Sequence, residues 1–299
     1  FTGTTFSEDL TLYAKWVSNA NQIVSVMSFN IKTELLKGNR VDRVVATITE
    51  NAPDILCLQE ADSSWMSSLK SKLSGAGYTF LSGSQGRDGG GSGEHTAIFY
   101  RADKVTPIAS STKWLSHTPD TAGSVYSYTE NGTTYKANYP RILTYAVMKR
   151  NSDGAIFAVV NTHLDNNGSN SHDVAEKIRE VEVDFLMKQI KGITDSRGNI
   201  PVIVTGDFNV IPNNRSAYNA MTQVYGYYDS SRITKQGEPK TTFTDMQDEN
   251  SGTILDYIFV SPNLRSVVET YTVCAAKRNG EWVSDHNAII AKIAIPKVN

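Results

Sequence analysis

Long apolar runs, surplus charge of one sign and clustered cysteines are all missing from this chain of 299 residues. Its longest apolar runs, such as 200–204 and 288–295, fall well short of the roughly 18 residues that cross a bilayer, so we expect no transmembrane segment. The 29 basic and 31 acidic residues give a net charge of -2, without a block of like charge. A basic surface dominates sequence-independent DNA binding, so the charge balance disfavours nucleic acid as a partner. Cys57 and Cys274 lie in apolar runs, which predicts small buried side chains rather than a disulfide.

A content of 39% hydrophobic and 20% charged residues is typical of a globular protein, and the length allows one large domain with an appendage. The first 16 residues, FTGTTFSEDLTLYAKW, alternate like a β-strand. They resemble the closing half of a Listeria–Bacteroides repeat, a small module of bacterial surface proteins. The resemblance implies a longer natural N-terminus and an extracellular, secreted or cell-surface location. We therefore expect 1–22 to be the end of a surface repeat or linker and 23–299 to be the main domain; an ordinary edge strand is the alternative for 1–16.

From Ile23 onward, apolar runs of strand type alternate with helical patterns. Helices are predicted at 41–50, 63–73 and 174–190, and strands at 23–31, 54–60, 95–101, 142–150, 155–164, 201–209, 253–260 and 286–295. Strands buried on both faces and interleaved with helices predict a layered α/β fold. Three stretches are predicted to be long loops without elements of their own, 83–93, 117–140 and 166–171, and such loops often bind ligands.

Polar residues stand where the predicted strands end. They are Asn30, Glu60, His163, Asp207 with Asn209, and Asp285 with His286. A carboxylate or imidazole at the end of an apolar strand is costly unless it meets a metal, a ligand or water. Single alternatives remain open: Asp207 could begin an Asx turn, His286 could be a core histidine, and Glu60 could cap the next helix. Asp256, inside the apolar run ILDYIFV, needs a buried partner.

The donor set favours a hard divalent ion. Glu, Asp and Asn offer oxygen ligands, and no HExxH or CxxC pattern indicates zinc. Mg²⁺ takes one or two carboxylates and keeps waters for a phosphate, with Mn²⁺ as an alternative. Histidine and asparagine can then donate to phosphate oxygens where charge develops. The inventory is that of a phosphoryl hydrolase.

Six ordered motifs carry a family resemblance: FN at 29–30, LQE at 58–60, NTHL at 161–164, GDFN at 206–209, LDYIFV at 255–260 and SDH at 284–286. They resemble the motifs of the endonuclease/exonuclease/phosphatase superfamily, and GEHTAIFYR, KWLSHTPD and Pro140-Arg141 resemble an uncharacterised bacterial branch of it. The resemblance implies a four-layer α/β/β/α sandwich of two packed mixed sheets flanked by helices, and it makes 23–299 the catalytic domain.

The resemblance also implies a role for each matched residue. Glu60 would be the principal metal ligand, with Asn30 and Asp285 near the same ion. Asp207 would orient or deprotonate the attacking water, and Asn209 would hold the phosphate. His286 would stabilise the pentavalent phosphorus or protonate the leaving oxygen, Asp256 would fix its tautomer, and His163 would be a second phosphate donor. Lys32 departs from many relatives, which leaves its contribution open.

Three further residues are candidates for substrate binding: Glu94, beside the glycine-rich loop, Tyr139 and Arg141. For Glu94 a salt bridge is the equal alternative, and Asp165 is interpreted as a loop residue. Together these observations predict a monomeric, Mg²⁺-dependent hydrolase of a phosphomonoester or phosphodiester in a compact substrate or chain end. The alternatives are an extracellular endonuclease on DNA or RNA, and a non-catalytic adhesion module.

Overall fold

Two six-stranded mixed sheets pack face to face in the computed structural model, which describes residues 22–33, 39–212, 216–249, 251–265 and 267–297. The first sheet has the order β13-β16-β1-β2-β4-β3 and the second β11-β12-β10-β9-β8-β5. The first comprises β1 (Ile23–Asn30), β2 (Ile55–Ala61), β3 (Tyr78–Phe80), β4 (His95–Arg101), β13 (Val268–Val273) and β16 (Ile289–Ala294). The second comprises β5 (Val105–Trp114), β8 (Ile142–Arg150), β9 (Ile156–His163), β10 (Val202–Asp207), β11 (Tyr228–Asp229) and β12 (Asp256–Val260).

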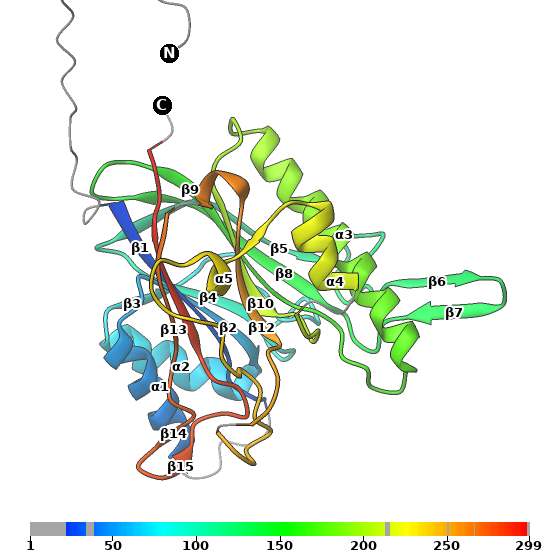
Figure 1. Cartoon of the computed structure of the whole chain (residues 1–299), viewed down its shortest axis with the longest axis horizontal. Helices are drawn as coiled ribbons and strands as arrows, with labels where there is room; N and C mark the ends of the chain where they lie inside the picture. The colour runs from blue at the N-terminus through cyan, green and yellow to red at the C-terminus, as the bar shows by residue number, and fades with distance from the viewer. Residues whose placement is uncertain (1–21, 34–38, 213–215, 250, 266, 298–299) are drawn as a thin grey trace, which may run out of the picture.

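Helices cover the outer face of each sheet (Figure 1). Helices α1 (Arg40–Asn51) and α2 (Ser63–Gly75) pack on the first sheet, and the long helix α3 (His172–Asp195) packs on the second. Smaller elements are α4 (Ser216–Asn219), the π-helix η2 (Ala220–Val224), α5 (Ser230–Ile233) and the 3₁₀ helix η3 (Pro262–Leu264). The predicted four-layer α/β/β/α sandwich is confirmed.

Three apolar cores separate these four layers. Side chains such as Val26 and Ile55 of the first sheet meet Val159 and Ile203 of the second in the middle core. The outer cores lie under α1 and α2 and under α3. Because both faces of the central strands are buried, their sequences are almost continuously apolar, which explains why those strands were predictable.

The expectation of a loop without elements at 117–140 was wrong. Strands β6 (Ser127–Glu130) and β7 (Thr133–Lys136) form a hairpin that projects beyond α3 (Figure 1). Its turn residues Asn131 and Gly132 both have positive φ, of 50° and 80°, the geometry that an Asn-Gly pair favours in tight hairpins. That dipeptide was the available sequence signal. The short strands β14 (Lys277–Arg278) and β15 (Glu281–Trp282) form a second small ribbon.

Residues 1–16 lie outside the described residues, so the predicted N-terminal strand and repeat stay predictions. None of the helices in the described ranges has the length and apolar character that crossing a membrane requires.

Candidate active site

Strand register places three of the predicted residues side by side in the second sheet. Asp207, the last residue of β10, pairs with His163 on parallel β9 and with Asp256 on antiparallel β12. All three side chains are buried. These three side chains therefore form a row across neighbouring strands at one end of the second sheet.

Asn30 joins this row to the first sheet. Its amide nitrogen Nδ2 donates to Glu60 Oε1 at 2.9 Å and to Asp207 Oδ2 at 3.0 Å. Asn30 ends β1, and its neighbour β2 carries Glu60 near its own end. The C-terminal ends of β1 and β2 in the first sheet and of β10 in the second thus converge on one polar cluster.

Backbone strain marks the same place. Glu60, Asn209 and Lys32 have left-handed φ values of 62°, 51° and 55°. The pairing of β2 with β4 shifts register between Leu58 and Ala61, which is where Glu60 lies. Non-glycine residues in this conformation cost free energy and persist where the surrounding structure holds them, often at functional sites.

His286 and Asp256 form a buried pair, with 2.8 Å between Nδ1 and Oδ2. The other ring nitrogen, Nε2, lies 3.7 Å from Asp207 Oδ2. Burial opposes the charged ring, but Asp256 and Asp207 outweigh it and raise the pKa of His286 to about 10. His286 is therefore a cation at neutral pH, positioned to donate from Nε2.

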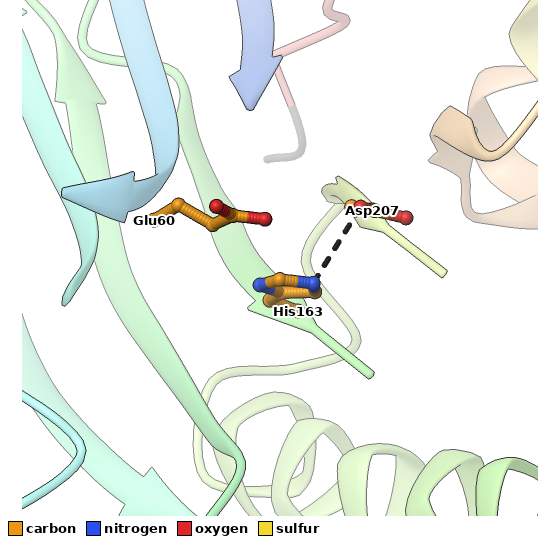
Figure 2. A group of neighbouring side chains, drawn as sticks. All are labelled: Glu60, His163 and Asp207. Carbon is orange, nitrogen blue, oxygen red and sulfur yellow. Dashed lines mark ion pairs between the residues drawn. The ribbon is translucent and has the colours of Figure 1, made fainter. Parts of the chain in front are cut away.

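His163 has the opposite electrostatic environment. Burial, reinforced by Arg141, His286 and Arg87, holds its pKa well below the usual histidine value, so the ring is neutral. Its Nε2 lies 3.2 Å from Asn209 Nδ2 and 3.5 Å from Asp207 Oδ2, the contact drawn in Figure 2. Two histidines beside one carboxylate thus have different protonation states.

Asp207 lies between them. Burial raises the pKa of its carboxyl group well above the usual aspartate range, against the lowering effect of His286. A carboxyl group that titrates closer to neutrality is a better proton acceptor in catalysis. Asp207 Oδ1 also accepts from the Asn209 amide at 2.9 Å, so Asp207 makes the Asx turn that was its alternative, and its catalytic role stays a prediction.

Two of the predicted substrate-binding residues, Glu94 and Arg141, line a small pocket next to this cluster, together with Glu60 and His163; Tyr139 is not part of its lining. Arg141 is buried, with its Nε 3.2 Å from Asp165 Oδ1. The Tyr139 ring is contacted by the guanidinium groups of Arg141 and Arg87, at 5.2 and 4.6 Å from its centroid.

The structure decides between alternatives that the sequence left open for three residues. Glu94 makes the salt bridge that was its alternative, 3.0 Å from Arg87. Glu60 does not cap α2, because Asp62 accepts from the first helical amides. Asp165 holds the 138–141 segment as a loop residue, through Asn138 and Arg141.

Sequence reasoning missed three polar residues that support the site. Gln59 Nε2 donates to Asn161 Oδ1 at 2.7 Å, and Asn161 Nδ2 donates to the Leu58 carbonyl at 2.8 Å, which ties the two sheets together directly beneath the cluster. Both are polar side chains fully buried in apolar strands, and a polar residue inside an apolar strand was the sequence signal that could have identified them. Arg87 was the third, inside the glycine-rich loop.

Comparison with known proteins decides the family. The model of the Endonuclease/Exonuclease/phosphatase family matches residues 27–286. The chain belongs to this family. Among curated proteins, none matches the sequence significantly.

Several solved structures share the fold. The endonuclease/exonuclease/phosphatase from Bacteroides vulgatus is 29% identical, with a TM-score of 0.78 over 92% of this chain and 99% of that one. The Bacteroides thetaiotaomicron mannosyl-6-phosphatase is 26% identical, with a TM-score of 0.73 over 90% and 98%. D. rerio TDP2 complexed with a single-strand DNA product is 20% identical, with a TM-score of 0.64 over 90% and 98%, and shares the fold alone.

Members of this family are metal-dependent phosphoester hydrolases, and the cluster contains suitable ligands. Ligand atoms of Glu60, His163 and Asp207 lie within 4.8 Å of one another, and Figure 2 shows these side chains directed into one space from β2, β9 and β10. The two carboxylates fit a hard divalent ion, whereas the imidazole is a ligand type that softer ions prefer.

The ligand oxygens of the other two predicted ligands, Asn30 and Asp285, already have hydrogen-bond or ion-pair partners. Asn30 presents its amide nitrogen to the carboxylates, while its Oδ1 accepts from the Lys32 amide at 3.0 Å. Asp285 Oδ2 lies 2.7 Å from the Lys32 ammonium. Asn30 would have to turn its amide over, and Asp285 would have to release Lys32, before either could ligate. Their ligand roles stay predictions.

Proposed function

We propose that this protein is a divalent-metal-dependent phosphatase that hydrolyses a compact phosphate ester by direct attack of an activated water. The observation that carries the proposal is the convergence of Asp207, neutral His163 and cationic His286 beside Glu60. These groups can supply a base, a phosphate donor, an acid and a metal ligand at one point. Similarity to the mannosyl-6-phosphatase favours a sugar phosphomonoester as substrate.

The side chains divide the reaction between them. Asp207 accepts a proton from the attacking water as the new O–P bond forms. His286 donates its Nε2 proton to the alkoxide that leaves as the ester P–O bond breaks, and Asp256 keeps the ring oriented and charged. Asn209 and His163 donate to the phosphate oxygens. The products are an alcohol and inorganic phosphate.

Glu60 would hold Mg²⁺ or Mn²⁺, together with Asp207 or with Asn30 and Asp285 once those are released. When bound, the ion would neutralise charge on the phosphate oxygens. Asn30 Nδ2 donates to both carboxylates and so links Glu60 to Asp207.

A compact substrate suits the surroundings of the site. The net charge is -2, and both arginines at the adjoining pocket already face carboxylates, Arg87 with Glu94 and Arg141 with Asp165. A polymer held through many phosphates needs unpaired basic groups along its path.

A substrate panel tests the proposal. Mannose 6-phosphate, a nucleoside monophosphate, a small phosphodiester and plasmid DNA would be assayed with Mg²⁺ or Mn²⁺, at about 50 and 200 mM salt, where a polymer binder with many phosphate contacts loses roughly a thousandfold or more in affinity. We expect chelator-sensitive release of phosphate from the small monoesters. Full activity in excess EDTA would contradict the metal, and plasmid nicking that collapses with salt, without small-ester turnover, would restore the endonuclease alternative.

We also propose an extracellular or cell-surface location and a monomeric state. The location rests on the resemblance of residues 1–16 alone. Fractionation of the source cells with an antibody tests the location, and light scattering of the purified chain tests the monomer.

A further inference from the structure

Arg87 and Glu94 stand as a fixed pair at the pocket beside the catalytic cluster. Their side chains lie 3.0 Å apart, Arg87 Nη1 to Glu94 Oε2, and remain 24% and 18% exposed. The pocket they line also includes Glu60 and His163. Resting on the proposed function, we propose that this pair recognises adjacent hydroxyl groups on the alcohol part of the substrate.

The backbone holds the pair in place independently of the salt bridge. The Arg87 amide donates to the Glu94 carbonyl at 2.9 Å, and the Arg87 carbonyl accepts from Trp114 Nε1 at 2.8 Å. Gly86 forms an isolated bridge with His95, directly beside the pair. Because both polar groups of the Arg87 peptide are engaged, its side chain leaves from a fixed point.

The glycine-rich loop between them is folded around the Asp88 carboxylate. Asp88 Oδ1 accepts from the Gly90 amide at 3.1 Å. A Cβ at Gly86 would lie 2.7 Å from the Gly93 carbonyl oxygen, and one at Gly93 would lie 2.9 Å from the Asp88 amide nitrogen, closer than real Cβ contacts. The glycines therefore let the loop close tightly, and the closed loop brings Arg87 back to Glu94. A salt bridge between two freely moving surface side chains would not require such an ordered loop.

The ring of Tyr139 also contacts the Arg87 guanidinium. The Tyr139 ring lies 4.6 Å from the Arg87 guanidinium and 5.2 Å from that of Arg141. Contacts of this kind hold a guanidinium in one plane while leaving its N–H groups available. Arg141 itself is anchored by Asp165 beneath the pocket.

The carboxylates around the pocket exclude a second phosphate group as the part of the substrate that binds there. Each arginine at the pocket already has a carboxylate partner, and Glu94 would repel another anion. A hydroxyl group fits better, because it both accepts from a guanidinium and donates to a carboxylate. Two neighbouring hydroxyls can satisfy Arg87 and Glu94 together, and the hydrogen bonds to these charged groups are stronger than neutral ones. A hexose and a ribose both offer such hydroxyls.

The test compares substrates with and without hydroxyls in the Glu94→Gln and Arg87→Lys variants. Kinetics with Mg²⁺ would be measured on mannose 6-phosphate, a ribonucleoside 5′-monophosphate and phenyl phosphate, which has no hydroxyl on its alcohol part. We expect KM for one hydroxyl-bearing substrate to rise on the order of tenfold to a hundredfold, as for loss of a hydrogen bond to a charged group. The rise for phenyl phosphate should be at least about tenfold smaller, since a site built for a hydroxyl discriminates by that bond. The substrate with the larger rise identifies the sugar.

Asp103→Asn is the matched control, because exposed Asp103 follows the far end of β4 and pairs with Arg101. It should change none of the three KM values. Equal losses on all substrates in Glu94→Gln would make the pair a structural salt bridge, and no loss on any would also overturn the proposal. A wild-type protein inactive on every phosphomonoester is a separate result, which would overturn the proposed function and this inference with it.

Discussion

The two ends of the paired sheets both bury charged groups, but they satisfy them differently. The N-terminal end of β1 borders a cavity of about 370 Å³ whose lining includes Asp54 and Arg150. The pocket next to the catalytic cluster, at the opposite end, has a volume of only about 10 Å³. Of these two cavities, the larger one lies at the end without the catalytic cluster.

Hydrogen bonding separates the two ends. At the wide cavity, Asp54 Oδ2 accepts from the Ser25 amide and hydroxyl at 2.8 and 2.9 Å. Arg150 donates to Asp153, to the Ile295 carbonyl and to the Gln22 carbonyl. At the catalytic end, buried Asp256 Oδ1 has no hydrogen-bond partner in the part of the chain that the structure describes. The shifted pKa values of Asp207, His163 and His286 gather around this atom, so electrostatics, rather than cavity volume, marks the site.

The largest effect should come from the His286–Asp256 pair. We expect His286→Ala to lower kcat roughly 10³-fold, within the range for loss of a general acid. Adding Asp256→Ala should cost little more, because residues that act as one unit are not additive. Steady-state kinetics of both single variants and the double variant measure this. Losses that multiply would give Asp256 a role independent of His286.

Glu60→Gln should have the next largest effect, on metal dependence. The amide keeps the shape of the side chain but removes a charged ligand, so the apparent metal affinity should fall on the order of a hundredfold. Mg²⁺ titrations of activity, with circular dichroism for the fold, measure it. Asp54→Asn at the wide cavity is the control and should leave the titration unchanged; an unchanged titration for Glu60→Gln would remove it from the metal site.

A smaller, pH-dependent effect should follow from Asp256→Asn. The pKa of His286 is raised to about 10 mainly by Asp256 and Asp207, against burial, so the wild-type ring stays protonated well above neutral pH. Removing one carboxylate lowers that pKa, so the alkaline limb of the kcat profile should move to lower pH while the acidic side changes less. An alkaline limb at its wild-type position would mean that His286 is not the acid.

Sequence patterns predicted the elements whose burial is uniform. Strands β4 and β8 matched their predicted ranges, because residues 95–101 and 142–150 are apolar runs between clear breaks. Strand β5 was missed, since it lies at a sheet edge, is only partly buried and contains Pro107 at a register shift. Strand β13, also at an edge, was missed for the same lack of a continuous apolar run.

The candidate site was predictable as a set of residues but not as a geometry. Strand ends and motif order indicated Asp207, Asp256 and His286, yet their pairing depends on strand register across distant parts of the chain. The bond from Asn30 to Asp207 spans 177 positions, and no local pattern specifies it. The pairing of Arg87 with Glu94 depends on how a glycine-rich loop closes, which periodicity does not reveal.

Arg150→Ala should have the smallest effect on activity, although it removes one of the most fully bonded side chains at the wide cavity. Arg150 is buried and bonds to Asp153 and to two backbone carbonyls, so its loss should lower the free energy of unfolding by about 3 kcal/mol. Because these bonds are far from Asp207 in the strand register, kcat should stay within about twofold of wild type wherever the protein is folded. Urea unfolding and kinetics on the same preparation measure both. Lys104→Ala, an exposed cation at the same cavity, is the control and should change neither quantity. A large fall in kcat without loss of stability would show that the two ends are coupled and that their contrast in hydrogen bonding does not separate structure from function.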